Sequence, residues 1–334
     1  MRPSAVRQAS SACVSVAASR RRARSALAVA FALIASCTSL PPTPPPTPLA
    51  PDPQISALRI DPVPSETASP PSTSPPPTAT PTLAPDAWQT YPIVPEVSER
   101  AVDIYSRGLA LGNNPGAFSK IGDCESTPTW FLGDFDRGAG YYRLGEHSEL
   151  EAVIGRFSGS FLRESLAAGR GFSASSVLTT LWANPDQCEP GESPLACELR
   201  VHRPSMAFVM LGTNDRWQDE MFESRMREIL DYLVEAGVVP ILATKADNLE
   251  GDGSLNATIV RLAYEYDLPL WNYWLAVQPL PSHGLQPDGA HITWARNHFD
   301  DAAAMRNGWP VRNLTALQAL DAVWRAVADP EPGA

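Results

Sequence analysis

From about residue 97 to residue 328, short apolar runs alternate with longer segments in which apolar residues recur every three or four positions. Runs that are apolar throughout suit strands covered on both faces, and they predict strands at 117–121, 206–211, 238–244 and 268–274. The helical period predicts helices at 219–235, 254–266 and 314–327. This alternation predicts a three-layer α/β/α sandwich with a central, mainly parallel sheet. The turn-rich stretch 184–203 is predicted to be a loop.

The amino terminus has the pattern of an export signal. Residues 1–24 contain six arginines and no acidic residue, and an apolar run follows at 25–35. That run is shorter than the roughly 20 residues that a helix needs to cross a bilayer. The run ends in Ile-Ala-Ser-Cys, which resembles the lipobox of bacterial lipoproteins. The resemblance implies removal of residues 1–36 and acylation of Cys37, and cleavage of an ordinary secretory signal nearby is the alternative.

Residues 37–95 differ in composition from the rest of the chain. They consist largely of Pro, Thr, Ser and Ala, with three consecutive prolines at 44–46 and again at 75–77. Such a segment cannot bury a core, and proline favours extended polyproline II. We therefore predict a disordered, semi-stiff tether at 37–95 and a folded domain at 96–330.

The charge of the chain excludes one class of partner. The formal net charge is −11, and loss of the six arginines in residues 1–36 takes it to −17. A strongly acidic protein repels the phosphate backbone, so nucleic acid is not an expected partner.

Three cysteines fall in the predicted folded domain, which is expected to lie in an oxidising compartment. Cys188 and Cys197 bracket a short loop rich in turn residues, so a disulfide between them is the simplest pairing. Cys124 is then left over, and an unpaired thiol in an exported protein needs an explanation by reactivity, burial or another partner. Zinc bound by all three cysteines is the alternative, which their spacing does not favour.

Polar residues follow the predicted strands at three places. Gly-Asp-Cys-Glu-Ser occupies 122–126, Gly-Thr-Asn-Asp occupies 212–215, and Asp-Gly-Ala-His occupies 288–291. In an open α/β sheet, ligands bind beyond the carboxyl ends of the strands. These three segments are therefore the candidate functional site.

Together, these segments resemble the motifs of the SGNH/GDSL hydrolases. That family has a Gly-Asp-Ser turn after the first strand, a later glycine, a Gly-x-Asn-Asp turn and a late Asp-x-x-His, and this chain matches all but the serine. The resemblance spans nearly the whole folded region and implies an SGNH hydrolase-like, flavodoxin-like domain that cleaves esters. It implies Cys124 as nucleophile, His291 as base and Asp288 as the carboxylate that orients it.

The resemblance also implies three donors for the developing oxyanion. These are the backbone N–H of Cys124, the backbone N–H of Gly171 and the side-chain amide of Asn214. Gly169 is the alternative for the second donor. Asp123 is expected to brace the turn through backbone hydrogen bonds.

Cysteine in place of serine leaves the chemistry open at this stage. A neighbouring imidazole lowers the pKa of a thiol and makes it a strong nucleophile. Glu125 argues against this, because a negative charge beside the sulfur disfavours the thiolate. Ser126 is an alternative nucleophile, and His283 is an alternative residue of the cleft.

We therefore predict an extracytoplasmic, lipid-anchored bacterial ester hydrolase that uses a Cys-His-Asp arrangement on a small-molecule or glycan ester. A catalytically silent protein that binds a glycan or acylated ligand is the alternative. No cofactor or metal is expected, because the sequence lacks the converging ligands of a metal phosphoesterase. The protein is expected to be a monomer.

Overall fold

A computed structural model describes residues 87–328, and the predicted signal, Cys37 and most of the predicted tether lie outside these residues. The sheet consists of β1 (Asn114–Gly122), β3 (Pro204–Met210), β4 (Val239–Ala243) and β5 (Leu270–Trp271). Its strands follow the order β1-β3-β4-β5, and every pair is parallel. All four carboxyl ends therefore meet at one edge of the sheet, as the positions of the motifs require.

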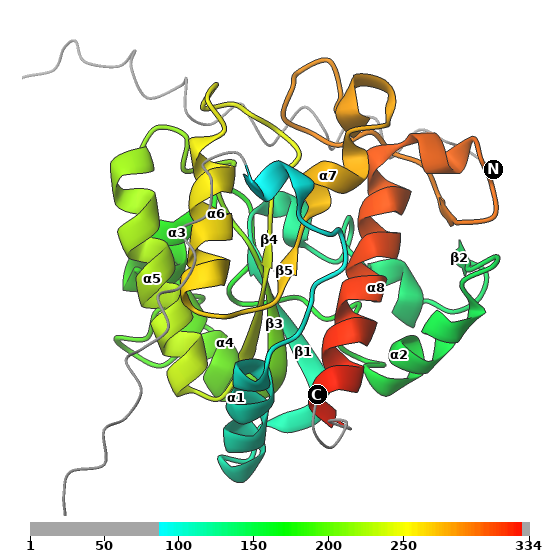
Figure 1. The fold of residues 1–334 in the computed structure, drawn as a ribbon. Coiled ribbons are helices and arrows are strands. Elements are labelled where there is room, and N and C mark those ends of the chain that lie inside the picture. The colour runs from blue at the N-terminus through cyan, green and yellow to red at the C-terminus, as the bar shows by residue number, and fades with distance from the viewer. Residues whose placement is uncertain (1–86, 329–334) are drawn as a thin grey trace, which may run out of the picture. The chain divides into compact units, whose positions relative to one another are not determined.

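Helices cover both faces of this sheet (Figure 1). One layer contains α3 (Ala174–Leu178), α4 (Pro194–His202), α5 (Asp219–Glu235) and α6 (Ser254–Glu265), of which α5 contacts both α3 and α6. The other layer contains α8 (Gly308–Ala328), which contacts α1 (Glu99–Ala110), α2 (Glu151–Arg156) and α7 (Tyr273–Val277). The predicted three-layer α/β/α sandwich with a central parallel sheet is therefore confirmed.

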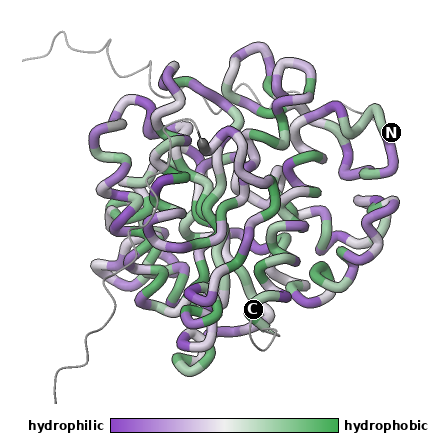
Figure 2. The backbone as a smooth tube through the Cα atoms, viewed as in Figure 1, coloured by the Kyte–Doolittle hydropathy of each residue, from purple (hydrophilic) through white to green (hydrophobic). Residues whose placement is uncertain are grey.

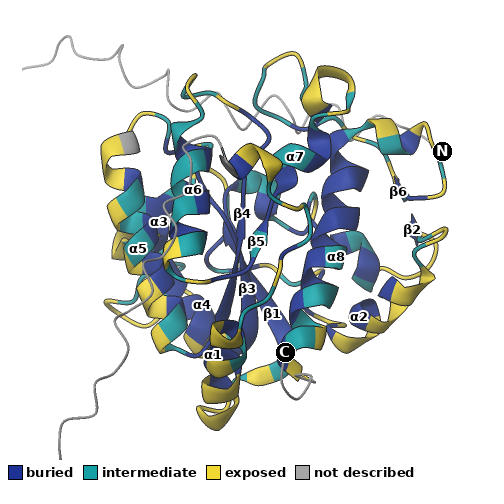
Figure 3. Cartoon of the chain, in the orientation of Figure 1, coloured by how far each residue is buried: buried dark blue, intermediate teal, exposed yellow. Residues whose placement is uncertain are grey.

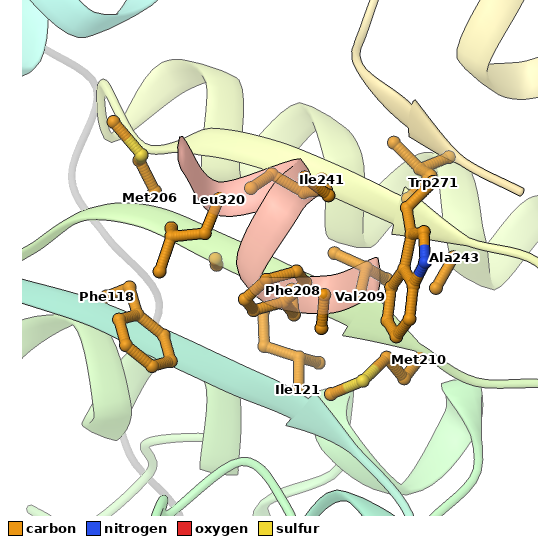
Figure 4. Close-up of a cluster of buried hydrophobic side chains, with 14 of the residues drawn as sticks. Phe118, Ile121, Met206, Phe208, Val209, Met210, Ile241, Ala243, Trp271 and Leu320 are labelled. Carbon is orange, nitrogen blue, oxygen red and sulfur yellow. The ribbon is translucent and has the colours of Figure 1, made fainter. Parts of the chain in front are cut away.

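The core lies where the sheet meets these helices. The strands are almost wholly buried, and the hydrophobic positions concentrate along them (Figures 2 and 3). Phe208 on β3 packs edge-to-face against Phe118 on β1 and Trp271 on β5, with ring centroids 5.8 and 5.7 Å away (Figure 4). Burial of each such side chain contributes about 1.5–3 kcal/mol, which holds the strand ends in fixed positions.

A second, two-stranded sheet lies beside the main fold. Here β2 (Tyr142–Arg143) pairs in parallel with β6 (Asn297–His298). Arg143 also donates to Asp300 at 2.9 Å. The segment that follows the first motif is thereby fastened to the segment that follows the last one.

Local side-chain chemistry corrects several predicted boundaries. The strand predicted at 268–274 ends at Trp271, because the Asn272 side chain accepts from Leu275 N and caps α7. The loop predicted at 184–203 contains α4, which Ser193 caps and which has Pro194 in its first turn. The last helix begins at Gly308 rather than at 314.

The folded part also begins before residue 96. Ala87–Thr90 forms a 3-10 helix, and Trp88 is buried with its ring centroid 4.6 Å from that of Trp274. The Asn272 side chain donates to the carbonyl groups of Trp88 and Tyr91. The end of the predicted tether therefore packs on the folded domain, where Trp88 and Ile93 supply apolar surface. Between residues 87 and 328, the helices are too short or too polar to span a bilayer.

Candidate active site

The turn after β1 presents Cys124 at the carboxyl edge of the sheet. Gly122 ends the strand, and a Cβ there would lie 2.2 Å from Ser126 Oγ and 2.6 Å from Met210 O. Asp123 accepts from Glu125 N at 2.9 Å, so the expectation that it braces the turn is confirmed. Cys124 then opens a short 3-10 helix, Cys124–Ser126, and takes part in no disulfide.

The late motif forms a hydrogen-bonded Asp-His pair. Asp288 Oδ2 lies 2.6 Å from His291 Nδ1, while Oδ1 accepts from the backbone N–H groups of Ala290 and His291 at 3.0 Å each. Partial burial acts to raise the pKa of Asp288, but its hydrogen bonds with His291 and Ala290 prevail and lower it. The carboxylate is thus ionised and fixed, and it determines how the ring of His291 is oriented.

The turn that carries Cys124 and the loop that carries His291 are in contact. Glu125, the residue after Cys124, accepts at Oε1 from the backbone N–H of Ile292, the residue after His291, at 3.1 Å. These two residues are far apart in the sequence, so tertiary structure alone makes them neighbours. The candidate nucleophile and the candidate base therefore lie on segments that a direct hydrogen bond joins.

The other two motifs meet at the same edge of the sheet. Asn214 Nδ2 donates to Phe172 O at 2.8 Å, which places this amide beside Gly171. Gly171 has φ +80°, a conformation that glycine adopts without strain. The alternative, Gly169, donates its N–H to Gly122 O at 3.1 Å and so is engaged in pairing with the end of β1.

Asp215 joins the segment that carries Asn214 to the segment that carries Gly171, a role that no pattern in the sequence indicated. Its carboxylate accepts from Ala174 N at 2.9 Å and from Gly212 N at 3.1 Å. Burial raises the pKa of Asp215 to about 6, even though these hydrogen bonds act to lower it. The Gly-x-Asn-Asp turn is thereby tied to the start of α3.

The structure excludes Ser126 as the nucleophile and His283 as a residue of the cleft. Ser126 is fully buried, and its Oγ packs beneath Gly122 where a substrate has no access. His283 is exposed, and its Nδ1 lies 3.1 Å from the carbonyl oxygen of Gln278, in a surface turn. Both interpretations are therefore wrong.

The objection that Glu125 places a negative charge beside the sulfur is weakened by the burial of this side chain. Burial raises the pKa of Glu125 to about 8, and this effect outweighs the opposing influence of the Arg312 guanidinium. Burial thus favours the neutral carboxyl group over the carboxylate beside the sulfur. From sequence alone the residue reads as a charge, because nothing local indicates that it is buried.

A disulfide joins Cys188 and Cys197, as predicted. The bond consumes two of the three thiols that the alternative zinc site required. Within residues 87–328, the only cluster with suitable metal-ligand spacing consists of these two bonded cysteines and Glu192. The disulfide fastens the loop before α4 to that helix.

A small polar cavity of about 30 Å³ lies behind the Cys124 turn. Charged side chains that the sequence did not single out contribute to its wall, namely Lys245, Asp247 and Arg312. Lys245 Nζ is 2.9 Å from Asp247 Oδ1 and 2.6 Å from Glu250 Oε2. Lys245 and Asp247 follow β4, and Arg312 comes from α8, so the packed fold alone brings them to the same wall as Glu125.

A comparison of sequences finds similarity to a bacterial thioesterase and lysophospholipase. No protein-family profile matches this sequence. A stretch of 151 residues is 27% identical to the thioesterase 1/protease 1/lysophospholipase L1 of Escherichia coli K12, and equally to the protein of that name from strain O6:H1. The match covers 39% of this chain and 73% of the relative. This sequence similarity supports the SGNH/GDSL family and an esterase- or lipase-like hydrolase.

Among solved structures, a GDSL-like lipase from Bacteroides thetaiotaomicron is similar to this chain, with a TM-score of 0.39 and 15% sequence identity. The match covers 67% of this chain and 98% of that lipase. The fold class itself follows from the parallel sheet order and the two helix layers.

Proposed function

We propose that this protein is an SGNH-type ester hydrolase in which Cys124 is the nucleophile, His291 the base and Asp288 the orienting carboxylate. The 2.6 Å hydrogen bond between Asp288 and His291, in a loop joined to the Cys124 turn, is the main support. The Cys124 and Gly171 N–H groups and the Asn214 amide would donate to the oxyanion. An amide nitrogen carries two hydrogens, so donation to Phe172 O leaves one for a substrate.

These residues support acyl transfer in two stages. His291 takes the proton of Cys124, and the sulfur attacks the acyl carbonyl carbon to give a tetrahedral oxyanion. The leaving alcohol or thiol departs with the proton from His291, and a thioacyl enzyme remains. A water molecule then attacks this thioester after giving a proton to His291, and the proton returns to the sulfur as the acid leaves. Asp288 stays ionised throughout and stabilises the imidazolium.

The substrate that we propose is a small or sugar-borne ester or thioester. The relative from Escherichia coli is named both a thioesterase and a lysophospholipase, so both kinds of acyl bond are candidates.

The experiment is turnover of p-nitrophenyl acetate and acetyl-thiocholine by the wild-type protein and by Cys124→Ala and His291→Ala. We expect each variant to lose about 10³-fold or more in kcat. Tyr232→Ala is the control, because this exposed residue of α5 lies outside the proposed site. Unchanged rates in both site variants would end the proposal.

A second candidate function follows from the cysteine at position 124, where the SGNH/GDSL motif has serine. The fold and the Asp-His pair would also suit a silent protein that retains the cleft for an acylated ligand or glycan. Cys124→Ser separates the two functions. A gain of esterase activity from an inactive wild type identifies a silent natural site, whereas a loss from an active wild type identifies a working thiol.

We also propose that the protein acts outside the cytoplasm as a monomer, anchored to the membrane through acylated Cys37 on a proline-rich tether. The cationic and then apolar amino terminus, which has the pattern of an export signal, supports this location. Cys37→Ser is expected to move the protein from the membrane fraction to the soluble fraction, and retention in the membrane would refute lipid anchoring at this residue.

A further inference from the structure

Glu125 occupies a position that the proposed acyl transfer does not use. It follows Cys124 directly, yet its side chain reaches the wall of the cavity and is only 16% exposed. There Oε1 accepts the backbone N–H of Ile292. One residue thus belongs covalently to the candidate nucleophile turn and is hydrogen-bonded to the loop of the candidate base.

Arg312 of α8 supports Glu125 from beneath. Its Nη1 donates to the backbone carbonyl of Glu125 at 2.9 Å and lies 4.0 Å from Oε2 of the same residue. The guanidinium group is stacked among three aromatic rings, with centroids 4.8 to 5.6 Å away, which belong to Phe131, Trp309 and Tyr273. Cation–π contacts and burial leave the Arg312 side chain little conformational freedom. Its hydrogen bond to Glu125 therefore fixes the position of the Cys124 turn relative to α8.

The surroundings explain why a carboxyl group suits this position. Arg312 faces it from α8, Asp123 from the same turn, His291 from the base loop and Tyr273 from α7. Lys245 and Asp247 line the same cavity. A protonated carboxyl keeps its carbonyl oxygen as an acceptor for Ile292 while adding no negative charge beside the sulfur.

We propose that Glu125 is a positioning residue that holds the His291 loop beside the Cys124 sulfur. Arg312 in turn holds Glu125 in place. The inference rests on the proposed function, because it assumes that Cys124 and His291 act as a pair. Without the Ile292 contact, the loop would lose its direct tie to the turn, and the imidazole would stabilise the thiolate less.

Alkylation of Cys124 by iodoacetamide tests this proposal without any ester substrate. The rate is followed from pH 5 to pH 9 on the full-length protein, with the modified peptide quantified by mass spectrometry so that only Cys124 is counted. The alkylation rate tracks the thiolate fraction, so its midpoint reports the pKa of the thiol. A role in folding alone would lower the unfolding temperature without moving that midpoint.

We expect Glu125→Ala to raise the midpoint by about one pH unit and to lower the alkylation rate at pH 7 about tenfold. Glu125→Gln keeps an acceptor for Ile292 and is expected to stay within about twofold of wild type at pH 7. Glu228→Ala, on the exposed face of α5, is the matched control and should change nothing. If Glu125→Ala does not fold, Glu125→Asp replaces it, since the shorter side chain no longer reaches Ile292.

The outcomes separate this inference from the proposed function. If His291→Ala lowers the alkylation rate but the Glu125→Ala and Glu125→Asp variants do not, the positioning role is refuted and the Cys-His pair stands. If Glu125→Gln is as slow as Glu125→Ala, the hydrogen bond to Ile292 is not the cause and the inference fails. If His291→Ala leaves the alkylation rate unchanged, the pair itself is refuted, and the inference falls with it.

Discussion

Two glutamates are withdrawn from solvent near β1, one beside the middle of the strand and one beyond its carboxyl end, and their side chains are held in different ways. Glu198 of α4 is fully buried beside Ser119, in the middle of the strand. It accepts from Ser119 Oγ, from Arg163 Nη1 at 2.7 Å and from Leu166 N at 2.7 Å. Both of its oxygens are therefore used, and its charge is balanced by a guanidinium at contact distance.

Glu125, beyond the carboxyl end of β1, has a poorer set of partners. Its side chain accepts from Ile292 N, and the nearest guanidinium nitrogen is 4.0 Å from Oε2. The comparison shows that burial alone does not define the role of a carboxylate. A buried carboxylate whose two oxygens are both hydrogen-bonded, such as Glu198, stabilises the fold. A buried carboxylate with few partners beside a cleft, such as Glu125, has a shifted pKa and is a candidate for function.

The largest predicted change in stability comes from substitution of Glu198. Glu198→Gln removes the charge that balances Arg163 and turns an acceptor for Leu166 N into a donor. We expect a loss of about 3–5 kcal/mol in the free energy of unfolding, the usual consequence of breaking a buried ion pair. Urea unfolding at pH 7 measures it. A loss below about 1 kcal/mol would contradict the assignment of Glu198 as a structural brace.

An intermediate effect is predicted for Glu125→Gln, and it depends on pH. Because the pKa is raised to about 8 in the fold, the native protein keeps a proton that the unfolded chain releases above about pH 4.5. Wild-type stability from this group is therefore complete at low pH and declines as the pH rises to about 8. Glutamine does not titrate, so we expect the variant to gain roughly 3 kcal/mol relative to wild type between about pH 5 and pH 8. Parallel pH profiles of the two proteins in urea unfolding would contradict the burial of Glu125.

The smallest effect is predicted for a carboxylate on the surface. Hydrogen bonds from Arg261 and Arg227 lower the pKa of Glu223 to about 2. Its contribution is present above the usual pKa of a glutamate and is lost as the pH falls towards 2. The three side chains are 34 to 42% exposed, so solvent screens the interaction. We expect Glu223→Gln to cost less than about 1 kcal/mol at pH 7 and still less in 1 M salt. A larger loss in the free energy of unfolding that salt does not change would contradict the idea that side-chain exposure sets the order of these three effects.

Elements whose signals are local could be predicted from the order of residues in the chain. Apolar runs marked the centres of β1, β3 and β4, the helical period gave α5 its observed bounds, and a turn-rich loop between Cys188 and Cys197 indicated their disulfide. The Asp288 and His291 pair was also readable, since three residues of one turn place the carboxylate at the ring.

The environment of the candidate thiol, by contrast, depends on contacts between segments that are distant in the chain. Arg312 donates to Glu125 across 187 positions of sequence, and Ile292 does so across 167. The same holds for Trp88, whose packing against Trp274 extends the fold into the proline-rich segment. Periodicity and motifs report what a residue does with its close neighbours in the chain. Burial, and with it the protonation of Glu125, depends on which distant segments the packed helices bring to the end of β1.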